Sequence, residues 1–253
     1  MIGNLAMKVS NDALAENHES AGTLASGATE KLRVAIVTGK FRPGERLRVE
    51  TLCELLEAGS SPVREALNRL AAEGLVDQHD QRGFWVPPVS WEELEELTRT
   101  RCWINEVCLR KSIGRGDTAW EEQIVIALHR LNQVARTHDI NTKGASPDWD
   151  RLHRAFHRAL ISACDSRILL DFADSLSDRA QRYRYIATAV GSPTRDIVGE
   201  HCAIANAVIA RDAESAVELM NEHLGSTMRR AGSIAESAAK PAAGQMRKRR
   251  AAP

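Results

Sequence analysis

The chain has few aromatic residues, no excess of charge and no long hydrophobic run. Only 4% of its 253 residues are Phe, Trp or Tyr, which suits helical bundles built from Leu, Ala, Val and Ile. It carries 34 basic and 34 acidic residues, so affinity for a nucleic acid would depend on locally placed charge. No apolar stretch approaches the length of a membrane span, and the N-terminus lacks the core of a signal peptide. We therefore expect a cytoplasmic protein.

Cysteine gives no sign of a disulfide framework. The five cysteines are odd in number, scattered over predicted helices and never spaced as CxxC. We expect reduced thiols in buried positions. The length suits two modest domains with a sizeable core.

The most informative stretch runs from Ser60 to Val86 and predicts one short helix followed by a tight hairpin. Ser61 is a suitable N-cap, and Pro62 would occupy the first helical position, where its missing N–H costs nothing. Gly74 is placed to end the helix in a left-handed conformation. The residues at three- and four-residue spacing predict one buried face: Val63, Ala66, Leu67, Leu70 and Ala71.

A helix with Arg near its start, followed by a hairpin with a basic tip, suits docking on DNA. Such a helix fits the major groove, and an Arg in its first turn can reach base edges or phosphates. The local pattern also fits a helix and hairpin packed inside a larger fold, since winged helices also serve as plain interaction modules. The candidate DNA-binding residues are Arg64, Ser61, Asn68, Arg69, Arg82, Gly83, Arg33 and Arg48.

The remainder of the chain predicts an all-helical bundle between two irregular ends. Pro87-Pro88 closes the hairpin, and every later segment follows helical periodicity, with breaks at Gly/Pro-containing stretches. The expected domains are a disordered segment 1–27, a winged helix-turn-helix domain 28–88, a helical domain 90–232 and a disordered basic tail 233–253. Within them we expect helices over residues 29–38, 50–57, 61–73, 91–113, 119–137, 148–164, 167–189, 195–211 and 213–231.

Four histidines form the second feature that carries chemistry. His153 and His157 are four residues apart on one helix, so both imidazoles lie on one face. His201 and His223 lie in the apolar stripes of the last two helices, so three helices can direct imidazoles to one point. Neutral imidazoles together suit Zn²⁺, with Ni²⁺ as a second possibility. Taken singly, each could equally be a satisfied core or surface histidine, and Asp150 could supply a ligand in place of His153.

Three segments in close succession resemble the GntR family of bacterial transcription regulators. They are PGERL (Pro43–Leu47), SPVREALNRLAAEGLV (Ser61–Val76) and QRGFWV (Gln81–Val86). With its helical second half, the chain is similar to the FadR-like branch, whose C-terminal FCD domain binds ligands, and most similar to its carbon-starvation-induced, glutarate-responsive repressors. One departure is Ser60, where the family often has a second Arg.

The resemblance implies a metal site and an effector site in the helical domain. Many members of the branch bind a metal with an Asp-x3-His pair and two later histidines, a pattern that His157, His201 and His223 match by position. His153 stands where the branch usually has Asp, which leaves the fourth ligand open.

The resemblance also implies an effector carboxylate paired with Arg101. The branch usually has Glu four residues further on, where this chain has Asn105. The run Arg182-Tyr183-Arg184-Tyr185 is close to that of the glutarate-responsive regulators and favours a dicarboxylate. Since a helix turns only part of such a run inward, about one Arg and one Tyr should face the site; the candidates are Arg182, Tyr183 and Tyr185.

Together these features predict a mainly α protein with an N-terminal winged helix-turn-helix and a C-terminal antiparallel helical bundle. The leading hypothesis is a homodimeric transcription regulator that acts as a repressor and whose affinity for an operator is controlled by a small carboxylate near a metal. One alternative is a regulator whose metal is structural or is itself the sensed signal. Another is a metal-dependent hydrolase or lyase, for which only Asp150 or Glu200 is placed to act as a base.

Overall fold

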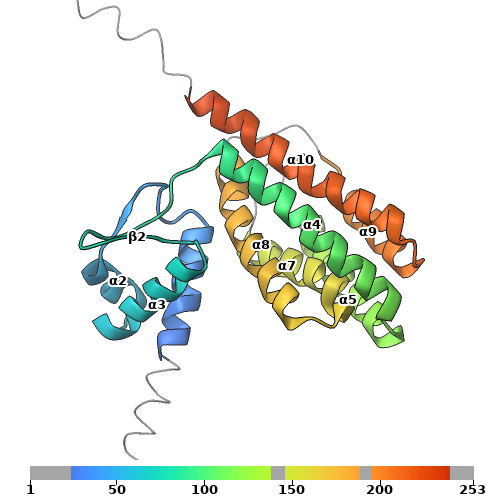
Figure 1. The fold of residues 1–253 in the computed structure, drawn as a ribbon, viewed down its shortest axis with the longest axis horizontal. Helices are drawn as coiled ribbons and strands as arrows, with labels where there is room; N and C mark the ends of the chain where they lie inside the picture. Colours follow the sequence, from blue (N-terminus) through green and yellow to red (C-terminus); the bar gives the residue numbers. More distant parts are fainter. Residues whose placement is uncertain (1–23, 138–145, 189–194, 240–253) are drawn as a thin grey trace, which may run out of the picture. The chain divides into compact units, whose positions relative to one another are not determined.

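The computed structural model describes residues 24–137, 146–188 and 195–239 and divides the chain into two compact units, Met1–Pro88 and Val89–Pro253. The predicted fold class is confirmed, because a small winged unit is followed by an all-helical one (Figure 1). The boundary falls at the Pro87-Pro88 pair.

The first unit is three helices and a small sheet. A helix over residues 24–37 is followed by α2 (Val49–Leu56) and α3 (Ser60–Ala72). The strands β1 (Arg46–Leu47), β2 (Asp77–His79) and β3 (Gly83–Trp85) form an antiparallel sheet in the order β1-β3-β2. The sheet packs on a shared core that includes Leu32, Ile36, Leu52, Leu67, Leu70 and Phe84.

Three details of the first unit differ from the expectation. The first helix is already formed at residue 24, the first described residue, and Ala25 on it is fully buried; the part of the predicted disordered segment up to residue 23 lies outside the described residues. The N-cap of α3 is Gly59, without a side-chain cap, so Ser61 is not the N-cap and Pro62 is the third helical residue, two positions further into the helix than predicted. The hairpin gains a third strand, β1, which pairs with β3.

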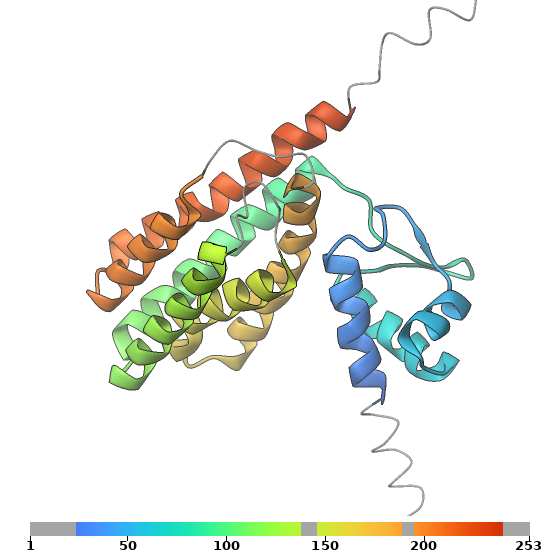
Figure 2. The same ribbon diagram turned by 180° about the vertical axis from the view of Figure 1, so that it is seen from behind.

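The second unit is an antiparallel bundle around one long helix, α4 (Trp91–Arg115). It is followed by α5 (Thr118–Thr137), α7 (Pro147–Ile161), the short 3-10 turn η1 (Ser162–Cys164), α8 (Arg167–Thr188), α9 (Ile197–Ile209) and α10 (Ala213–Ala239). Helix α4 packs against α10, α8 and α7, and α5 packs against α7 and α9 (Figures 1 and 2). The core includes Leu109, Ile124, Phe156, Leu160, Ile204 and Met220.

Side-chain caps fix where three of these helices begin. The Ser90 hydroxyl accepts a hydrogen bond from the Glu93 N–H (3.1 Å) at the start of α4. Ser146 caps α7, with Pro147 at its first position, and Asp196 caps α9. The caps of α7 and α9 set where the helices that carry His153, His157 and His201 begin, and the cap of α4 sets where the bundle begins.

The last helix is longer than expected. Helix α10 continues to Ala239, so the first residues of the predicted basic tail are helical, and the part from residue 240 lies outside the described residues. None of the described helices combines the length and the hydrophobicity that crossing a bilayer requires. The five thiols are free, and Cys108 and Cys164 are buried.

Candidate DNA-binding surface and metal centre

Helix α3 and the hairpin of β2 and β3 border one groove in the first unit. The groove has a volume of about 670 Å³ and contains four arginines but one carboxylate, that of Glu50. Five of the eight residues that the sequence singles out for DNA line it: Arg64 and Asn68 from α3, Arg48 from the start of α2, and Arg82 and Gly83 from the hairpin. The side chains of Arg64 and Asn68 are exposed, so both are available to a ligand in the groove.

Arg46 lies in the groove as well; together with Arg33 and Arg48, its place in the sequence already makes it a possible phosphate contact. Its Nη2 donates to the Arg82 carbonyl oxygen (2.8 Å), and its guanidinium lies over the Trp85 ring, 5.4 Å from the centroid. It therefore stiffens the hairpin and adds positive charge to the groove. It belongs to the PGERL segment, whose last two residues form β1 of the sheet.

Three candidates lie outside the groove, each for a structural reason. Arg33 forms a two-pronged ion pair with Glu73, and its side chain is only 15% exposed, so it links two helices and is not free to reach phosphate. Arg69 pairs with Glu65 along α3 (2.5 Å). Ser61 is exposed within the first turn of α3 but does not line the groove.

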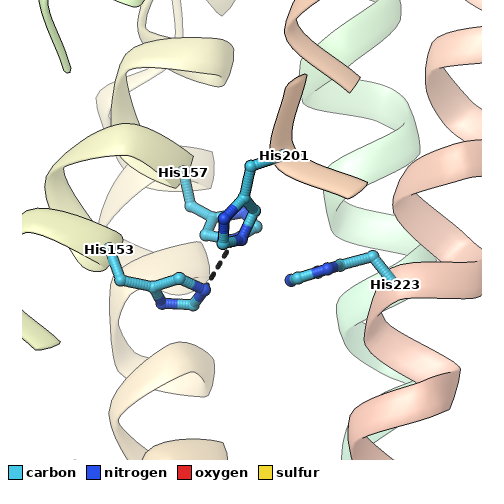
Figure 3. A group of neighbouring side chains, drawn as sticks. All are labelled: His153, His157, His201 and His223. Atoms are coloured by element: carbon cyan, nitrogen blue, oxygen red, sulfur yellow. Dashed lines mark hydrogen bonds between the residues drawn. The ribbon is translucent and has the colours of Figure 1, made fainter. Parts of the chain in front are cut away.

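The second unit brings the four predicted histidines together. His153 and His157 come from α7, His201 from α9 and His223 from α10, and their rings face one another (Figure 3). One nitrogen from each ring lies within 4.8 Å of those of the other three. In a tetrahedral zinc site with Zn–N bonds of about 2.0–2.1 Å, ligand nitrogens are roughly 3.3–3.4 Å apart. A small inward movement would give that geometry.

The chemistry of these nitrogens fits a metal. His201 is 1% exposed, and its buried Nε2 has no hydrogen-bond partner within the described part of the chain. Burying such a group unsatisfied costs free energy, which a cation bound to its lone pair would offset. All four rings lose basicity: burial is the first cause of the lowered pKa of His153, His157, His201 and His223, and neighbouring positive charge adds to it. Neutral imidazole is the form that binds metals.

A carboxylate behind His223 fixes the tautomer of that ring. The His223 Nδ1–H donates to Glu200 Oε2 (2.7 Å), which leaves Nε2 as the free lone pair. The Arg195 guanidinium forms a two-pronged ion pair with Glu200 and also donates to the His223 carbonyl oxygen. Although burial opposes it, these bonds lower the pKa of Glu200 to about 2. Such outer-shell carboxylates orient metal-binding histidines and raise their basicity.

His153 has a different set of neighbours. Its ring stacks on Trp149 (4.4 Å between centroids), and its Nδ1 accepts a hydrogen bond from Arg184 Nη1 (3.1 Å). Since Nδ1 is the acceptor, the ring proton lies on Nε2, which faces His157 Nε2 at 3.1 Å. As arranged, His153 therefore donates to His157. It would have to move its proton to Nδ1 before its Nε2 could bind a metal.

Asp150 does not join the four histidines. Its carboxylate accepts hydrogen bonds from Arg184 and from the Tyr185 hydroxyl, and it is 5% exposed. Burial raises the pKa of Asp150 and lowers that of Arg184. The alternative in which Asp150 replaces His153 as a ligand is therefore not seen; Asp150 holds Arg184 and Tyr185 beside the cluster.

Arg101, on α4, adds an uncompensated positive charge near the cluster. Its Nε is buried without a hydrogen-bond partner, and no carboxylate of the described residues forms an ion pair with it. Burial, with a contribution from Arg184, lowers its pKa to about 10, and its charge in turn lowers the pKa of His157 and His223. Asn105 does not brace it, because the Asn105 amide donates to the Arg101 backbone carbonyl (2.8 Å).

The run from Arg182 to Tyr185 divides between two places on α8. Arg184 and Tyr185 contact Asp150 beside the histidines, whereas Tyr183 donates to Glu93 (2.5 Å) and accepts from the Ser90 N–H (3.4 Å) at the start of α4. Arg182 lies beside Glu93 as well, at 3.6 Å. Of this run, Arg184 and Tyr185 therefore lie beside the four histidines, whereas the candidates Arg182 and Tyr183 contact the start of α4.

The remaining histidines take no part in the cluster. His79 and His129 are exposed, and His79 contacts Trp85 edge-on. His18 and His138 lie outside the described residues.

Comparison with known proteins assigns both units. Residues 24–86 match the family described as bacterial regulatory proteins, gntR family, and residues 96–226 match the FCD domain. The chain is 35% identical over 206 residues to the HTH-type transcriptional regulator BphR of Paraburkholderia xenovorans (strain LB400), covering 81% of this chain and 84% of that protein. It is 34% identical over 197 residues to the HTH-type transcriptional repressor GlaR of Escherichia coli (strain K12), covering 76% and 89%.

Solved structures show the same fold at lower identity. The chain matches Escherichia coli McbR/YncC with a TM-score of 0.71 and 21% identity, covering 85% of this chain and 98% of that one. A putative GntR transcriptional regulator from Rhodococcus sp. RHA1 matches with a TM-score of 0.67 and 22% identity, covering 83% and 97%.

Acid should lower the stability of the metal-free protein, because the buried imidazoles resist protonation in the folded state. The pKa of each ring is lower in the folded chain than the roughly 6.5 of an unfolded chain, so the unfolded state binds more protons below about pH 6.5. We expect the free energy of unfolding to fall by at least about 1 kcal/mol between about pH 7.5 and 5.5. Chemical denaturation of chelator-treated protein measures this. The His153→Gln/His157→Gln double variant should show a weaker dependence, and equal dependence in both proteins would contradict the assignment.

Proposed function

The chain belongs to the GntR family of bacterial regulatory proteins and carries an FCD domain, and from this premise we propose that it is a repressor controlled by a small carboxylate bound beside a metal. The family consists of transcription regulators that bind DNA operators, not of enzymes. One observation carries the finer proposal: four imidazoles meet next to two arginines, Arg101 and Arg184, whose Nε groups are buried without acceptors among the described residues.

The groove of the first unit is the proposed DNA contact. Helix α3 would enter the major groove, with Arg64 and Asn68 directed at base edges. Arg82 and Gly83 at the hairpin tip would follow the backbone or the minor groove, and Arg46 and Arg48 would contact phosphates. Since the chain has no net charge, these local arginines would supply the salt-dependent part of the affinity.

The four histidines are the proposed metal ligands. His201 and His223 each keep a ring nitrogen that accepts no hydrogen bond among the described residues. If His153 moved its ring proton to Nδ1, its own Nε2 and the Nε2 of His157, to which it now donates, would both become available to a cation. An all-nitrogen set favours Zn²⁺ or Ni²⁺ over Mn²⁺. When bound, the metal would supply a Lewis acid that attracts an anion. Arg101 and Arg184 would orient the carboxylate through charge-assisted hydrogen bonds, which favours a dicarboxylate.

Helix α8 is the proposed connection between the effector site and the DNA-binding domain. Arg184 and Tyr185 contact Asp150 beside the histidines, and one residue earlier Tyr183 holds Ser90 and Glu93. Ser90 is the N-cap of α4, two residues after the first unit ends. An effector that moves Arg184 would shift α8, and with it the hydrogen bonds of Tyr183 to Ser90 and Glu93 at the start of α4. The effector must favour one of the two arrangements, or it would change nothing.

A homodimer is the proposed assembly. A regulator with one winged helix per chain reads a palindromic operator as a two-fold symmetric pair. The second unit also leaves large apolar side chains exposed, including Trp103 at 59% and Phe172 at 57%, and exposed apolar surface of this kind favours protein contacts.

The hydrolase hypothesis requires a general base, and neither candidate carboxylate is available for that role. Glu200 is held by Arg195 and His223, and Asp150 by Arg184 and Tyr185, so neither carboxylate is free to accept a proton from water. Together with the family assignment, this supports a regulatory rather than a catalytic role for the histidine site.

Replacing Arg64 should weaken specific binding without unfolding the protein. We expect Arg64→Ala to lose about 1–3 kcal/mol of operator affinity, because a base contact would be removed. An electrophoretic or anisotropy titration on a duplex selected from random sequences measures it. Arg69→Ala is the matched control on the same helix and should lose less. Unchanged affinity of Arg64→Ala at both low and moderate salt would remove Arg64 from the interface.

Removing one imidazole should remove the metal. We expect wild-type protein loaded with Zn²⁺ and dialysed to retain about one ion per chain and His157→Ala to lose most of it, since a tetrahedral site needs its ligands. Elemental analysis measures the ratio. His129→Ala, which changes an exposed histidine, should retain metal as wild type does. Negligible metal in wild type and variant alike would end the metal proposal.

Loosening the contact between α8 and α4 should uncouple ligand from DNA. In Tyr183→Phe the hydroxyl contacts to Glu93 and Ser90 are lost while the ring packing remains. We expect glutarate to stabilise the metal-loaded variant thermally as it does wild type, but to change operator affinity at least about threefold less. A wild-type response of the operator affinity would rule out this route.

A further inference from the structure

One carboxylate lies among the arginines of the groove in the first unit. The groove is lined by Arg46, Arg48, Arg64 and Arg82, and by the acidic side chain of Glu50. Glu50 is exposed, and it takes no part in the ion pairs that the described residues form with one another. The groove therefore presents an unpaired carboxylate to whatever binds there.

The position of Glu50 on α2 (Val49–Leu56) places it on the groove. As the second residue of the helix it interacts favourably with the helix dipole, but that interaction does not require the side chain to line a groove. Glu54, one turn further along, is exposed as well and does not line it. Residue 50 is thus where α2 adds an acidic group to the surface that α3 and the hairpin share.

The phosphates of DNA give Glu50 no partner. Duplex DNA carries one negative charge per about 1.7 Å of its axis, and a carboxylate beside it is repelled. Arginines attract the phosphates of any sequence, so they support non-specific and specific binding alike. Glu50 opposes both, except where the bound duplex supplies a hydrogen-bond donor. A base can supply that donor at a fixed place, and then only in the correct sequence.

The donors that a duplex offers in its major groove are exocyclic amino groups. Cytosine presents the amino group on N4 and adenine the one on N6, whereas guanine and thymine present acceptors; carboxylates pair with the cytosine donor. Glu50 lines the same groove as Arg64 and Asn68 of α3, the helix that the proposed function places in the major groove. Its carboxylate is therefore presented to the same side of the duplex as these two side chains.

Arg64 and Glu50 have complementary preferences. A guanidinium donates to O6 and N7 of guanine, and a carboxylate accepts from an amino group. A guanine or thymine opposite Glu50 would bring two acceptors together without a hydrogen bond. A wrong base would thus be excluded by repulsion, which raises specificity without requiring tighter binding to the correct sequence.

We propose that Glu50 is a specificity-determining residue of the DNA-binding surface, which accepts a hydrogen bond from the exocyclic amino group of a cytosine or an adenine in the operator. The proposal rests on the proposed function of the groove and goes beyond it, because it assigns base recognition to an acidic residue of α2. The main effect of Glu50 is on the ratio of operator affinity to random-sequence affinity.

The test compares full-length wild type, Glu50→Ala and Glu50→Gln in selections from random duplexes. We expect wild type to select cytosine or adenine at one position of each half-site and Glu50→Ala to accept all four bases there. In anisotropy titrations, the operator-to-random affinity ratio of Glu50→Ala should fall at least about fivefold. Its affinity for random duplex should rise at least about twofold.

Two further variants separate the acceptor from the charge and from the helix start. Glu50→Gln keeps an acceptor oxygen without the charge, so it should retain part of the base preference while it gains affinity for random duplex. Glu54→Ala removes a carboxylate from the same helix outside the groove and should behave as wild type. Circular dichroism verifies that the variants are folded.

Methylated operators distinguish the two bases. In a paired N4-methylcytosine or N6-methyladenine, the methyl group replaces the amino hydrogen that points into the major groove, while the base pair is kept. At the selected position, one of these substitutions should weaken wild-type binding at least about fivefold and leave the binding of Glu50→Ala unchanged.

The failure of this inference is distinguishable from that of the proposed function. If Glu50→Ala keeps the base preferences and the affinity ratio of wild type, while Arg64→Ala loses operator affinity, the inference is wrong and the proposed DNA contact stands. If wild type selects no sequence from the random duplexes, the inference fails together with the proposed function of the groove.

Discussion

The polar interior of the second unit is arranged around one constraint: four imidazole rings lie close together inside a helical bundle. Rings whose nitrogens lie within 4.8 Å of one another cannot all be protonated, because the charges would repel in a poorly solvated site. Leaving buried ring nitrogens without a partner is also costly, and the Nε2 of His201 has no hydrogen-bond partner in the described part of the chain. The shared cation that we propose would resolve both conditions, and the surrounding polar groups are arranged consistently with it.

The polar groups lie on two sides of the cluster and hold different histidines. Arg195 and Glu200 hold His223 from behind and fix its tautomer, while Arg184 and Asp150 hold His153 from the other side. The carboxylates orient bases and counter-charges but do not approach the point where the rings meet. The centre is therefore rich in donors and positive charge, which is the environment that an incoming anion requires. The same helix, α8, reaches from this centre to the start of α4.

The sequence predicted the parts of the site that follow from periodicity and missed those that depend on helix rotation. The spacing of His153 and His157 placed both rings on one face, and apolar stripes oriented His201 and His223 inward. In the run from Arg182 to Tyr185 consecutive side chains are about 100° apart, so only the packing of α8 decides that Arg184 faces the cluster. The sequence offered Arg33 as a phosphate contact because nothing local shows its ion-pair partner: Glu73 is 40 residues away in sequence. The N-cap of α3 is Gly59 and not Ser61, because local sequence signals define a helix boundary only to within one or two residues.

X-ray absorption at the zinc edge tests the central claim most directly. For Zn²⁺-loaded wild-type protein with glutarate, the account predicts nitrogen and oxygen scatterers at about 2.0–2.1 Å with the multiple scattering of several imidazoles. A spectrum dominated by sulfur at about 2.3 Å, or by oxygen without imidazole scattering, would place the metal elsewhere and contradict the account.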